Sequence, residues 1–414
     1  TLGSRGPEGI PTAYFGDIIA NLYALDATTG ELVWQTSPDD HHSATLTGTP
    51  AFANGNLYVP VSSLEVVTAA NPEYACCTFR GHVMAVNGDD GAILWDSYAI
   101  PNAPISIEDT KAGTKIFAPS GAPVWTSPTI DAERNLLIFG TGENYSSPAD
   151  KNSDAVIAVR LDTGERIWSR QTFPEDAWNV ACMMVDNPNC PEEDGPDYDQ
   201  ASSPLLVDIG DGKTVVVAGQ KDGRVFALDW QTGTKKLWEV RLGRGSIQGG
   251  VHFGMAADGA TVYVPINDMN DTRNGEWLDP KTARPGVSAV DAATGEVLWS
   301  HLQKNVCGEG RPFCDPGVSA AITATDRAVI AGHLDGIIRI YDSASGEIIW
   351  TYDTTVPVTG TNGVTAKGGG MSGSGPALGA GHMVINSGYG LYNHEAGNAL
   401  LVFAPRSEGA ISER

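Results

Sequence analysis

The sequence is poor in positive charge and has no long apolar run. It carries 26 Lys and Arg against 50 Asp and Glu, which gives a formal net charge of −24. This balance argues against binding a nucleic-acid backbone or an anionic membrane surface, because phosphates need Lys and Arg. No apolar stretch is long enough to cross a bilayer, so we expect no membrane insertion. The charge favours an acidic exported protein, with a specific cationic partner as the alternative.

Several catalytic signatures are also missing. The sequence contains no CxxC, no CxxCH and no Gly-x-Ser-x-Gly, and no histidines at metal-ligand spacing. These absences argue against a zinc site, a haem carried by this chain and a propeller hydrolase with a serine nucleophile. No helical segment of useful length alternates with the strands, which argues against a parallel α/β fold.

The six cysteines fall into three local pairs: Cys76 and Cys77, Cys182 and Cys190, and Cys307 and Cys314. An even set of closely spaced cysteines favours disulfides and an oxidising compartment over zinc. We therefore predict disulfides for the pairs separated in sequence, Cys182–Cys190 and Cys307–Cys314, and a periplasmic or secreted protein. The last two pairs are expected to clasp long loops. The adjacent pair is harder to explain, since neighbouring cysteines rarely bond to each other.

A repeated segment ending in tryptophan dominates the chain. A short alternating strand ends in Asp or Asn, a Gly-containing turn follows, and a return strand carries the tryptophan. Upstream of most copies lies another strand pair, so each unit has about four antiparallel strands. The six copies are NLYALDATTGELVWQ, HVMAVNGDDGAILWD, AVIAVRLDTGERIWS, RVFALDWQTGTKKLWE, GVSAVDAATGEVLWS and IIRIYDSASGEIIWT, and NALLVFAPRSEGA is a degenerate seventh.

Four-stranded units at this interval predict an all-β fold, a β-propeller. With 414 residues, 49 Gly and 25 Pro, we expect a single propeller domain over residues 1–414, with seven visible blades and eight in the full fold. The chain starts without Met, in TLGSRGPEGIPTAYFGD, and we expect it to lack an N-terminal portion. The insertions 102–118, 175–200 and 268–285 are expected to form loops at one rim.

The repeat tryptophans are expected to pack blade on blade. They are Trp34, Trp95, Trp168, Trp238, Trp299 and Trp350. Trp125 lies outside the repeat position, in GAPVWTSPTID, and is a candidate for stacking on a cofactor.

The repeat, together with CCTFRG, FGTGENYSSP, DAWNVACMM, GRGSIQGGVHFGMAADG and VPINDMNDTR, resembles the quinoprotein alcohol dehydrogenases that use pyrroloquinoline quinone (PQQ). The polyvinyl-alcohol dehydrogenase branch is the most similar. The resemblance implies an eight-bladed propeller that holds PQQ and Ca²⁺. It also implies an alcohol substrate, possibly a polymer, and a separate cytochrome c that takes the electrons.

The same resemblance assigns site residues. It implies that the Cys76–Cys77 disulfide covers one face of the quinone and that Trp125 covers the other. Ca²⁺ ligands are expected at Glu65 and Glu143, with Asn144 as an alternative to Glu143. Contacts to the cofactor are expected from Thr47, Ser62, Arg80 and Lys221, the last also polarising the quinone for catalysis.

One position departs from the pattern of the methanol-oxidising relatives. Their general base is the last residue of an Asp-x-Trp-Asp motif, which here reads DAWN and ends in Asn179. Asparagine cannot take a proton, so Asp176 in the same motif becomes the candidate base, with Glu65 or Glu143 as further options.

Two functions compete on these observations. The first is oxidation of a secondary alcohol by a PQQ- and Ca²⁺-dependent enzyme. The second is a non-catalytic propeller of the outer-membrane assembly type, which would scaffold protein partners. Such a scaffold would not need the adjacent cysteines, Glu65, Trp125 and Glu143 to converge.

Overall fold

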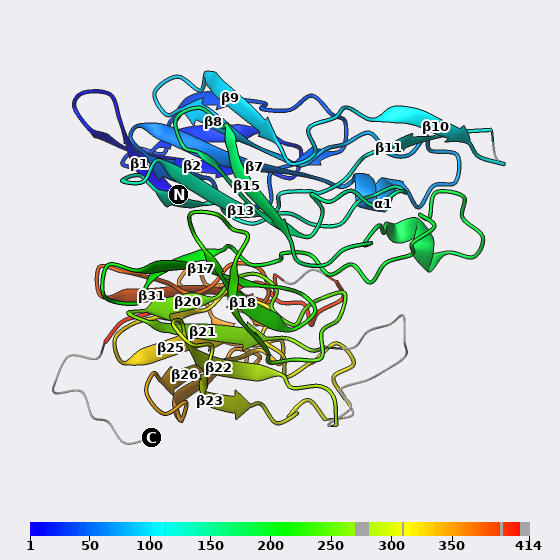
Figure 1. Ribbon diagram of the computed structural model, residues 1–414. Coiled ribbons are helices and arrows are strands. Elements are labelled where there is room, and N and C mark those ends of the chain that lie inside the picture. Colours follow the sequence, from blue (N-terminus) through cyan, green and yellow to red (C-terminus); the bar gives the residue numbers. More distant parts are fainter. Residues whose placement is uncertain (112, 270–280, 309, 390–391, 406–414) are drawn as a thin grey trace.

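The computed structural model describes residues 1–111, 113–269, 281–308, 310–389 and 392–405. In these residues seven antiparallel sheets follow one another as the blades of a β-propeller, which confirms the predicted fold class (Figure 1). The blades in chain order are β1 (Leu2–Arg5), β2 (Ile10–Gly16), β3 (Leu22–Asp26) and β4 (Leu32–Thr36); β5 (Ala44–Thr45), β6 (Ala51–Ala53), β7 (Asn56–Ser63), β8 (His82–Asn87) and β9 (Ile93–Tyr98); β12 (Thr129–Asp131), β13 (Leu136–Gly140), β14 (Ala155–Arg160) and β15 (Arg166–Gln171); β16 (Leu205–Asp208), β17 (Thr214–Gly219), β18 (Arg224–Asp229) and β19 (Lys236–Arg241); β20 (Ala256–Asp258), β21 (Thr261–Ile266), β22 (Gly286–Asp291) and β23 (Val297–Leu302); β24 (Thr323–Ala324), β25 (Ala328–Gly332), β26 (Ile337–Asp342) and β27 (Ile348–Asp353); and β30 (Ala377–Gly379), β31 (His382–Ser387) and β32 (Ala399–Phe403).

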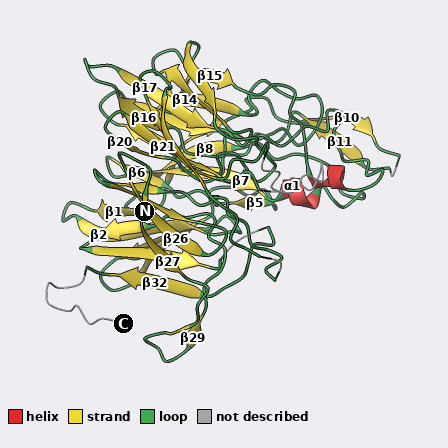
Figure 2. Cartoon of the chain, turned by 90° about the horizontal axis from the view of Figure 1, so that it is seen from below, coloured by secondary structure: helices red, strands yellow, loops and turns green. Residues whose placement is uncertain are grey.

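The remaining elements lie in the loops between these strands. They are the hairpin β10 (Ile105–Asp109) and β11 (Lys115–Ala118), the pair β28 (Val358–Thr359) and β29 (Thr365–Ala366), the helix α1 (Glu65–Thr68) and the 3₁₀ helix η1 (Val180–Met183). The insertion 102–118, expected as a loop, therefore contains a hairpin. Figure 2 shows strands throughout, with α1 and the hairpin projecting together at one end. Within the described residues, no helix is long and apolar enough to span a membrane.

The repeat tryptophans join the blades, as predicted. The indole N–H of Trp168 donates to the carbonyl of Trp230 in the next blade, at 3.0 Å. A Cβ built on Gly233 would lie 2.2 Å from the Trp168 ring, so the turn must carry glycine to let the blades meet. The same bond and the same turn glycine recur where Trp34, Trp95, Trp238 and Trp299 meet the following blade.

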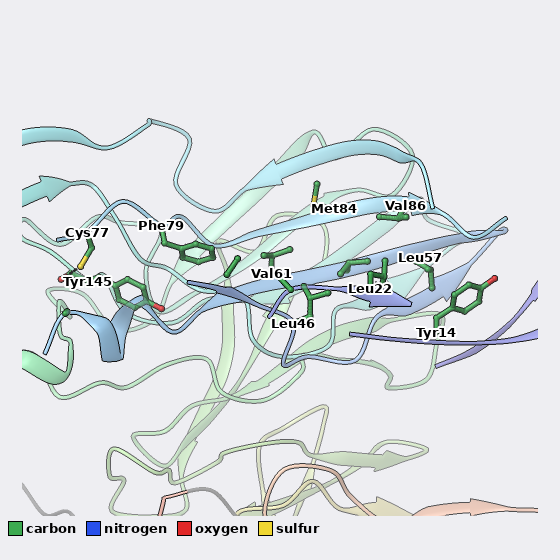
Figure 3. Packing of buried hydrophobic residues seen from close by; sticks show 14 of the residues in the cluster. Tyr14, Leu22, Leu46, Leu57, Val61, Cys77, Phe79, Met84, Val86 and Tyr145 are labelled. Atoms are coloured by element: carbon green, nitrogen blue, oxygen red, sulfur yellow. Dashed lines mark hydrogen bonds between the residues drawn. The ribbon is translucent and has the colours of Figure 1, made fainter. Parts of the chain in front are cut away.

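The hydrophobic core lies between consecutive blades. Alternating residues of the inner strands pack face to face, and six clusters of buried apolar side chains separate the seven blades described. Figure 3 shows the cluster between the first two blades, which runs from Tyr14 to Cys77 and Tyr145. Phe15 on the first blade and Leu400 and Val402 on the seventh are exposed. An eighth blade stays a prediction.

Candidate active site

The loops at the ends of the inner strands form a connected rim. Single backbone bridges link Arg80 to Gly121, Gly121 to Asn144, and Asn144 to Ala177. Segments that lie far apart in the sequence are thereby held side by side, and several predicted site residues fall in or next to this row.

Four charged side chains from the third and fourth blades meet here, and we call them the acid–lysine cluster: Glu143, Asp197, Asp199 and Lys221. Glu143 follows β13, the two aspartates precede β16, and Lys221 follows β17. The Lys221 ammonium lies 2.8 Å from Asp197 Oδ1 and 2.9 Å from Asp199 Oδ2. All four side chains are buried. The carboxylate oxygens of the three acids lie within 4.8 Å of one another.

Burial and mutual charge interactions shift the pKa values of the cluster. Burial, reinforced by Asp199 and Asp197, raises the pKa of Glu143 well above its usual range. Burial raises the pKa of Asp197 as well, against the attraction of Lys221. Burial acts against ionisation of Asp199 too, but Lys221 and hydrogen bonds outweigh it and lower its pKa. The cluster is therefore expected to hold an ionised Asp199 and protons that its other carboxyls release reluctantly.

Trp125 borders the cluster from the loop before β12. Its indole N–H donates to Asp199 Oδ2 at 2.9 Å, and its ring centroid lies 5.6 Å from Lys221 Nζ. The rings of His252 and Phe253 approach it edge-on at 5.7 Å each. Trp125 is half-buried, and unlike the repeat tryptophans its indole N–H bonds to a carboxylate rather than to a backbone carbonyl of the next blade.

His252 was not predicted as a site residue. It is buried, and its Nδ1 bonds to Ser319 Oγ at 2.8 Å. Burial and the nearby Lys221 ammonium hold the pKa of His252 well below its ordinary value. The imidazole beside Trp125 is therefore neutral at physiological pH.

Glu65 lies elsewhere. Its carboxylate accepts hydrogen bonds from Thr78 N at 2.8 Å, from Phe79 N at 2.9 Å and from the Tyr74 hydroxyl at 2.7 Å. These donors leave Glu65 engaged in holding the loop that follows the adjacent cysteines. The structure does not bring it into the acid–lysine cluster with Glu143.

All three predicted disulfides are present. Cys76 and Cys77 are fully buried in the core between the first two blades, where Tyr145 packs beside them (Figure 3). Trp125 has different neighbours, namely Asp199, Lys221, His252 and Phe253. The described contacts thus do not place the disulfide opposite Trp125.

Arg80 also points away from the cluster. Its guanidinium stacks 3.9 Å from the centroid of Tyr98 and donates to the carbonyls of Ile100 and Pro101. Ser62 is buried at the end of β7, paired with Thr45 of β5, whereas Thr47 is exposed.

The DAWN motif has a structural role in this protein. Asn179 caps η1, and its amide donates to the carbonyls of Tyr145 and Asn189. The carboxylate of Asp176 accepts from the backbone N–H groups of Asp197 and Tyr198. Asp176 therefore holds the backbone of the segment that carries Asp197 and Asp199.

The side chain of Asn144 is also occupied by hydrogen bonds within the protein. Its side chain donates to the Ser120 carbonyl at 2.8 Å and accepts from Asp150 N. Of the two alternatives at this position, Glu143 is the one in the cluster.

Asp197 and Asp199 are the acids that sequence reasoning missed. They stand in PDYDQ, near the end of the insertion 175–200. Asp197 has a φ of +61° and the segment is not a strand, so strand periodicity could not have marked the two acids. Gly142 shows how close the segments come, because a Cβ there would lie 3.0 Å from Asp199 Oδ1.

Two protein families match parts of this chain. The family described as glucose/ethanol/alcohol dehydrogenase, β-propeller domain, matches residues 40–244. The family described as outer membrane protein assembly factor BamB matches residues 221–372 and 283–402. The first match covers every member of the acid–lysine cluster.

Individual relatives are dehydrogenases. A polyvinylalcohol dehydrogenase of Pseudomonas sp. is 35% identical over 411 residues, covering 96% of this chain and 63% of that protein. A second, from Sphingopyxis sp. (strain 113P3), is 36% identical over 399 residues, covering 94% and 60%. A solved europium-containing methanol dehydrogenase shares the fold with a TM-score of 0.64 and 18% identity, covering 96% of this chain and 73% of that one. The chain thus spans about three fifths of the length of these curated relatives.

Proposed function

We propose that the chain is a PQQ-dependent quinoprotein alcohol dehydrogenase that oxidises a secondary alcohol at the acid–lysine cluster, which its similarity to the alcohol dehydrogenase propeller family and to polyvinylalcohol dehydrogenases supports. The observation that carries this proposal is the cluster itself. Three buried carboxylates and one ammonium beside a half-buried tryptophan are costly to bury, and the packing of the blades does not require them.

The residues fit a calcium ion. Glu143, Asp197 and Asp199 offer carboxylate oxygens, the ligands that Ca²⁺ prefers, close enough together to share one ion. This set differs from the ligands expected from the sequence, which were Glu65 together with Glu143 or Asn144. Glu65 and Asn144 already have hydrogen-bond partners within the protein.

The residues also fit a planar quinone. The Trp125 ring does not take part in the blade-joining contacts of the repeat tryptophans, and Lys221 Nζ lies over it at 5.6 Å from the centroid. The Thr126 hydroxyl next to it is buried with no hydrogen-bond partner among the described residues. When bound, PQQ would supply the hydride acceptor and Ca²⁺ a Lewis acid.

The chain's own residues have distinct tasks. Asp197 takes the proton of the alcohol, because its only hydrogen-bond partner among the described side chains is Lys221, whereas Asp199 is also engaged by Trp125 and Glu143 N. Burial raises the pKa of Asp197 above its ordinary value, so its carboxylate, once ionised, is a stronger base than that of an exposed aspartate. Lys221 orients both aspartates, and Asp176 fixes their backbone.

The names of the relatives suggest the substrate class, a polymer of secondary alcohols such as polyvinyl alcohol. A separate cytochrome c is proposed as electron acceptor. The three disulfides support a periplasmic or secreted location, since such bonds persist in oxidising compartments.

Reconstitution tests the proposal. PQQ and Ca²⁺ are added to the full-length protein, and reduction of a redox dye is followed with a secondary alcohol. We expect reduction that needs both additions. No PQQ binding by absorbance and no dye reduction would instead favour the scaffold function, which is consistent with the match of residues 221–402 to the BamB family.

A further inference from the structure

An exposed apolar surface lies at the end of the molecule where α1 and η1 meet, and we call it the rim patch. Figures 1 and 2 show the two short helices side by side. Its members are Leu64 (41% exposed), Val67 (52%), Met183 (56%), Met184 (48%) and Val185 (93%). Apolar side chains gathered in this way mark interaction sites more often than scattered ones do.

Hydrogen bonds and a disulfide fix the backbone beneath the rim patch. The Asn189 side-chain amide donates to the carbonyls of Ala69, Asn71 and Tyr74, just after α1. The Asn187 amide donates to the Ala70 carbonyl at 2.8 Å. The Cys182–Cys190 disulfide closes the loop that carries Met183 to Val185. The apolar side chains are therefore presented by an ordered surface.

The charge around the patch has one sign. Segments 64–79 and 180–199, which build it, contain five Asp and Glu that are not buried, and no Lys or Arg. Glu73, Asp186 and Glu192 are exposed there. An apolar centre with an acidic border on a chain of net charge −24 fits a partner whose contact face is cationic.

The patch is also joined to the acid–lysine cluster. Asn179, which caps η1, donates to the carbonyl of Tyr145 at 2.9 Å. Tyr145 follows Glu143 by two residues. One hydrogen bond and a short run of chain thus separate the patch from a member of the cluster.

We propose that the rim patch is the docking surface of a cationic protein that accepts single electrons, an inference that rests on the proposed function. Oxidation of a secondary alcohol to a ketone releases two electrons and two protons. A one-electron acceptor must therefore dock twice in each turnover and leave in between. A small apolar centre with charge attraction at its border suits such a brief encounter.

The test uses a c-type cytochrome of basic isoelectric point as probe. Its binding to the full-length protein is measured by calorimetry at low and high salt, and its reduction is measured beside that of a small dye. The patch variants are Glu73→Lys with Asp186→Asn, and Val185→Ser. Asn is chosen at position 186 because φ there is +53°, a region that Asn tolerates. The matched control, Glu133→Lys with Asp326→Asn, makes the same change in net charge on the exposed β12–β13 and β24–β25 turns.

We expect the charge variant to weaken binding by about tenfold at low salt, and Val185→Ser by about threefold, with dye reduction unchanged. The control should change binding by less than about twofold. Equal weakening by patch and control variants would overturn the proposal, as would absence of binding to the unaltered protein. So would self-association that Val185→Ser abolishes while cytochrome binding persists, because the patch would then join copies of this chain. If the unaltered protein does not reduce the dye, the proposed function is refuted. Calorimetry of cytochrome binding would still test the rim patch.

Discussion

Replacing Lys221 by Met should destabilise the metal-free protein strongly. The ammonium is only 6% exposed and lies within 2.9 Å of two carboxylates, which its loss would leave buried beside a third. Removing one partner of a buried ion pair costs about 3–5 kcal/mol, and methionine fills similar space, so the loss is electrostatic rather than steric. We expect the free energy of unfolding at about pH 8 to fall by that amount.

The pH dependence identifies the cause. Without the ammonium, burial and mutual repulsion raise the carboxyl pKa values in the folded state above those in the unfolded state. Such a carboxyl does not lower the free energy of unfolding at low pH, where it is protonated in both the folded and the unfolded state. It lowers that free energy as the pH rises through its pKa in the folded state. The deficit of Lys221→Met should therefore shrink at about pH 5.

Adding Ca²⁺ should restore part of the stability that Lys221→Met loses. An ion held by Glu143, Asp197 and Asp199 replaces the missing charge, and a ligand at 100 times its Kd adds about 2.7 kcal/mol to stability. Chemical denaturation at two pH values, with and without Ca²⁺, makes the measurement, with Lys304→Met on an exposed site as control. A deficit below about 1 kcal/mol, or one that is equal at both pH values, would refute the reasoning.

Three further predictions rest on single contacts. Trp168→Ala should lower the free energy of unfolding by about 3–5 kcal/mol, because the ring is buried between two blades; a loss below about 1 kcal/mol in urea denaturation would contradict the docking role. Asp315→Asn should stabilise the protein at about pH 8 by up to ~4 kcal/mol and have no effect below about pH 4, because burial raises the pKa of Asp315 to about 7; thermal melts across pH check this, and a gain that persists at low pH would exclude the explanation. Asp176→Ala should lower kcat and also loosen the segment that carries Asp197, seen as faster amide exchange at residues 197 and 198, whereas a chemical role alone would leave exchange unchanged.

The fold could be predicted because the same short sequence pattern occurs in successive blades. The strand, the turn glycine and the tryptophan recur six times, and five of the six tryptophans bond to the next blade. Local spacing predicted Cys182–Cys190 and Cys307–Cys314, whereas the family resemblance implied Cys76–Cys77. The site was only partly predictable: Trp125, Glu143 and Lys221 come together as their family positions imply, whereas Glu65 and Arg80 lie elsewhere.

The missed residues lie where the sequence has no periodic pattern. Asp197 and Asp199 belong to a long insertion whose path is set by tertiary contacts, such as the bonds from Asp176 to their segment. The DAWN motif suggested Asp176 as the base, but in the structure its carboxylate accepts hydrogen bonds from the backbone of Asp197 and Tyr198, while Asn179 caps η1. Only the closure of the third blade against the fourth identifies which acids meet Lys221.

The rate of dye reduction by Asp197→Asn tests the account most directly. The variant keeps an oxygen that can accept from Lys221 but cannot take a proton. In protein reconstituted with PQQ and Ca²⁺, we expect kcat with a secondary alcohol to fall at least ~100-fold. PQQ binding should persist, and the exposed control Asp208→Asn should retain full activity. A kcat for Asp197→Asn within about threefold of the unaltered protein would contradict the proposed role of Asp197 at the acid–lysine cluster.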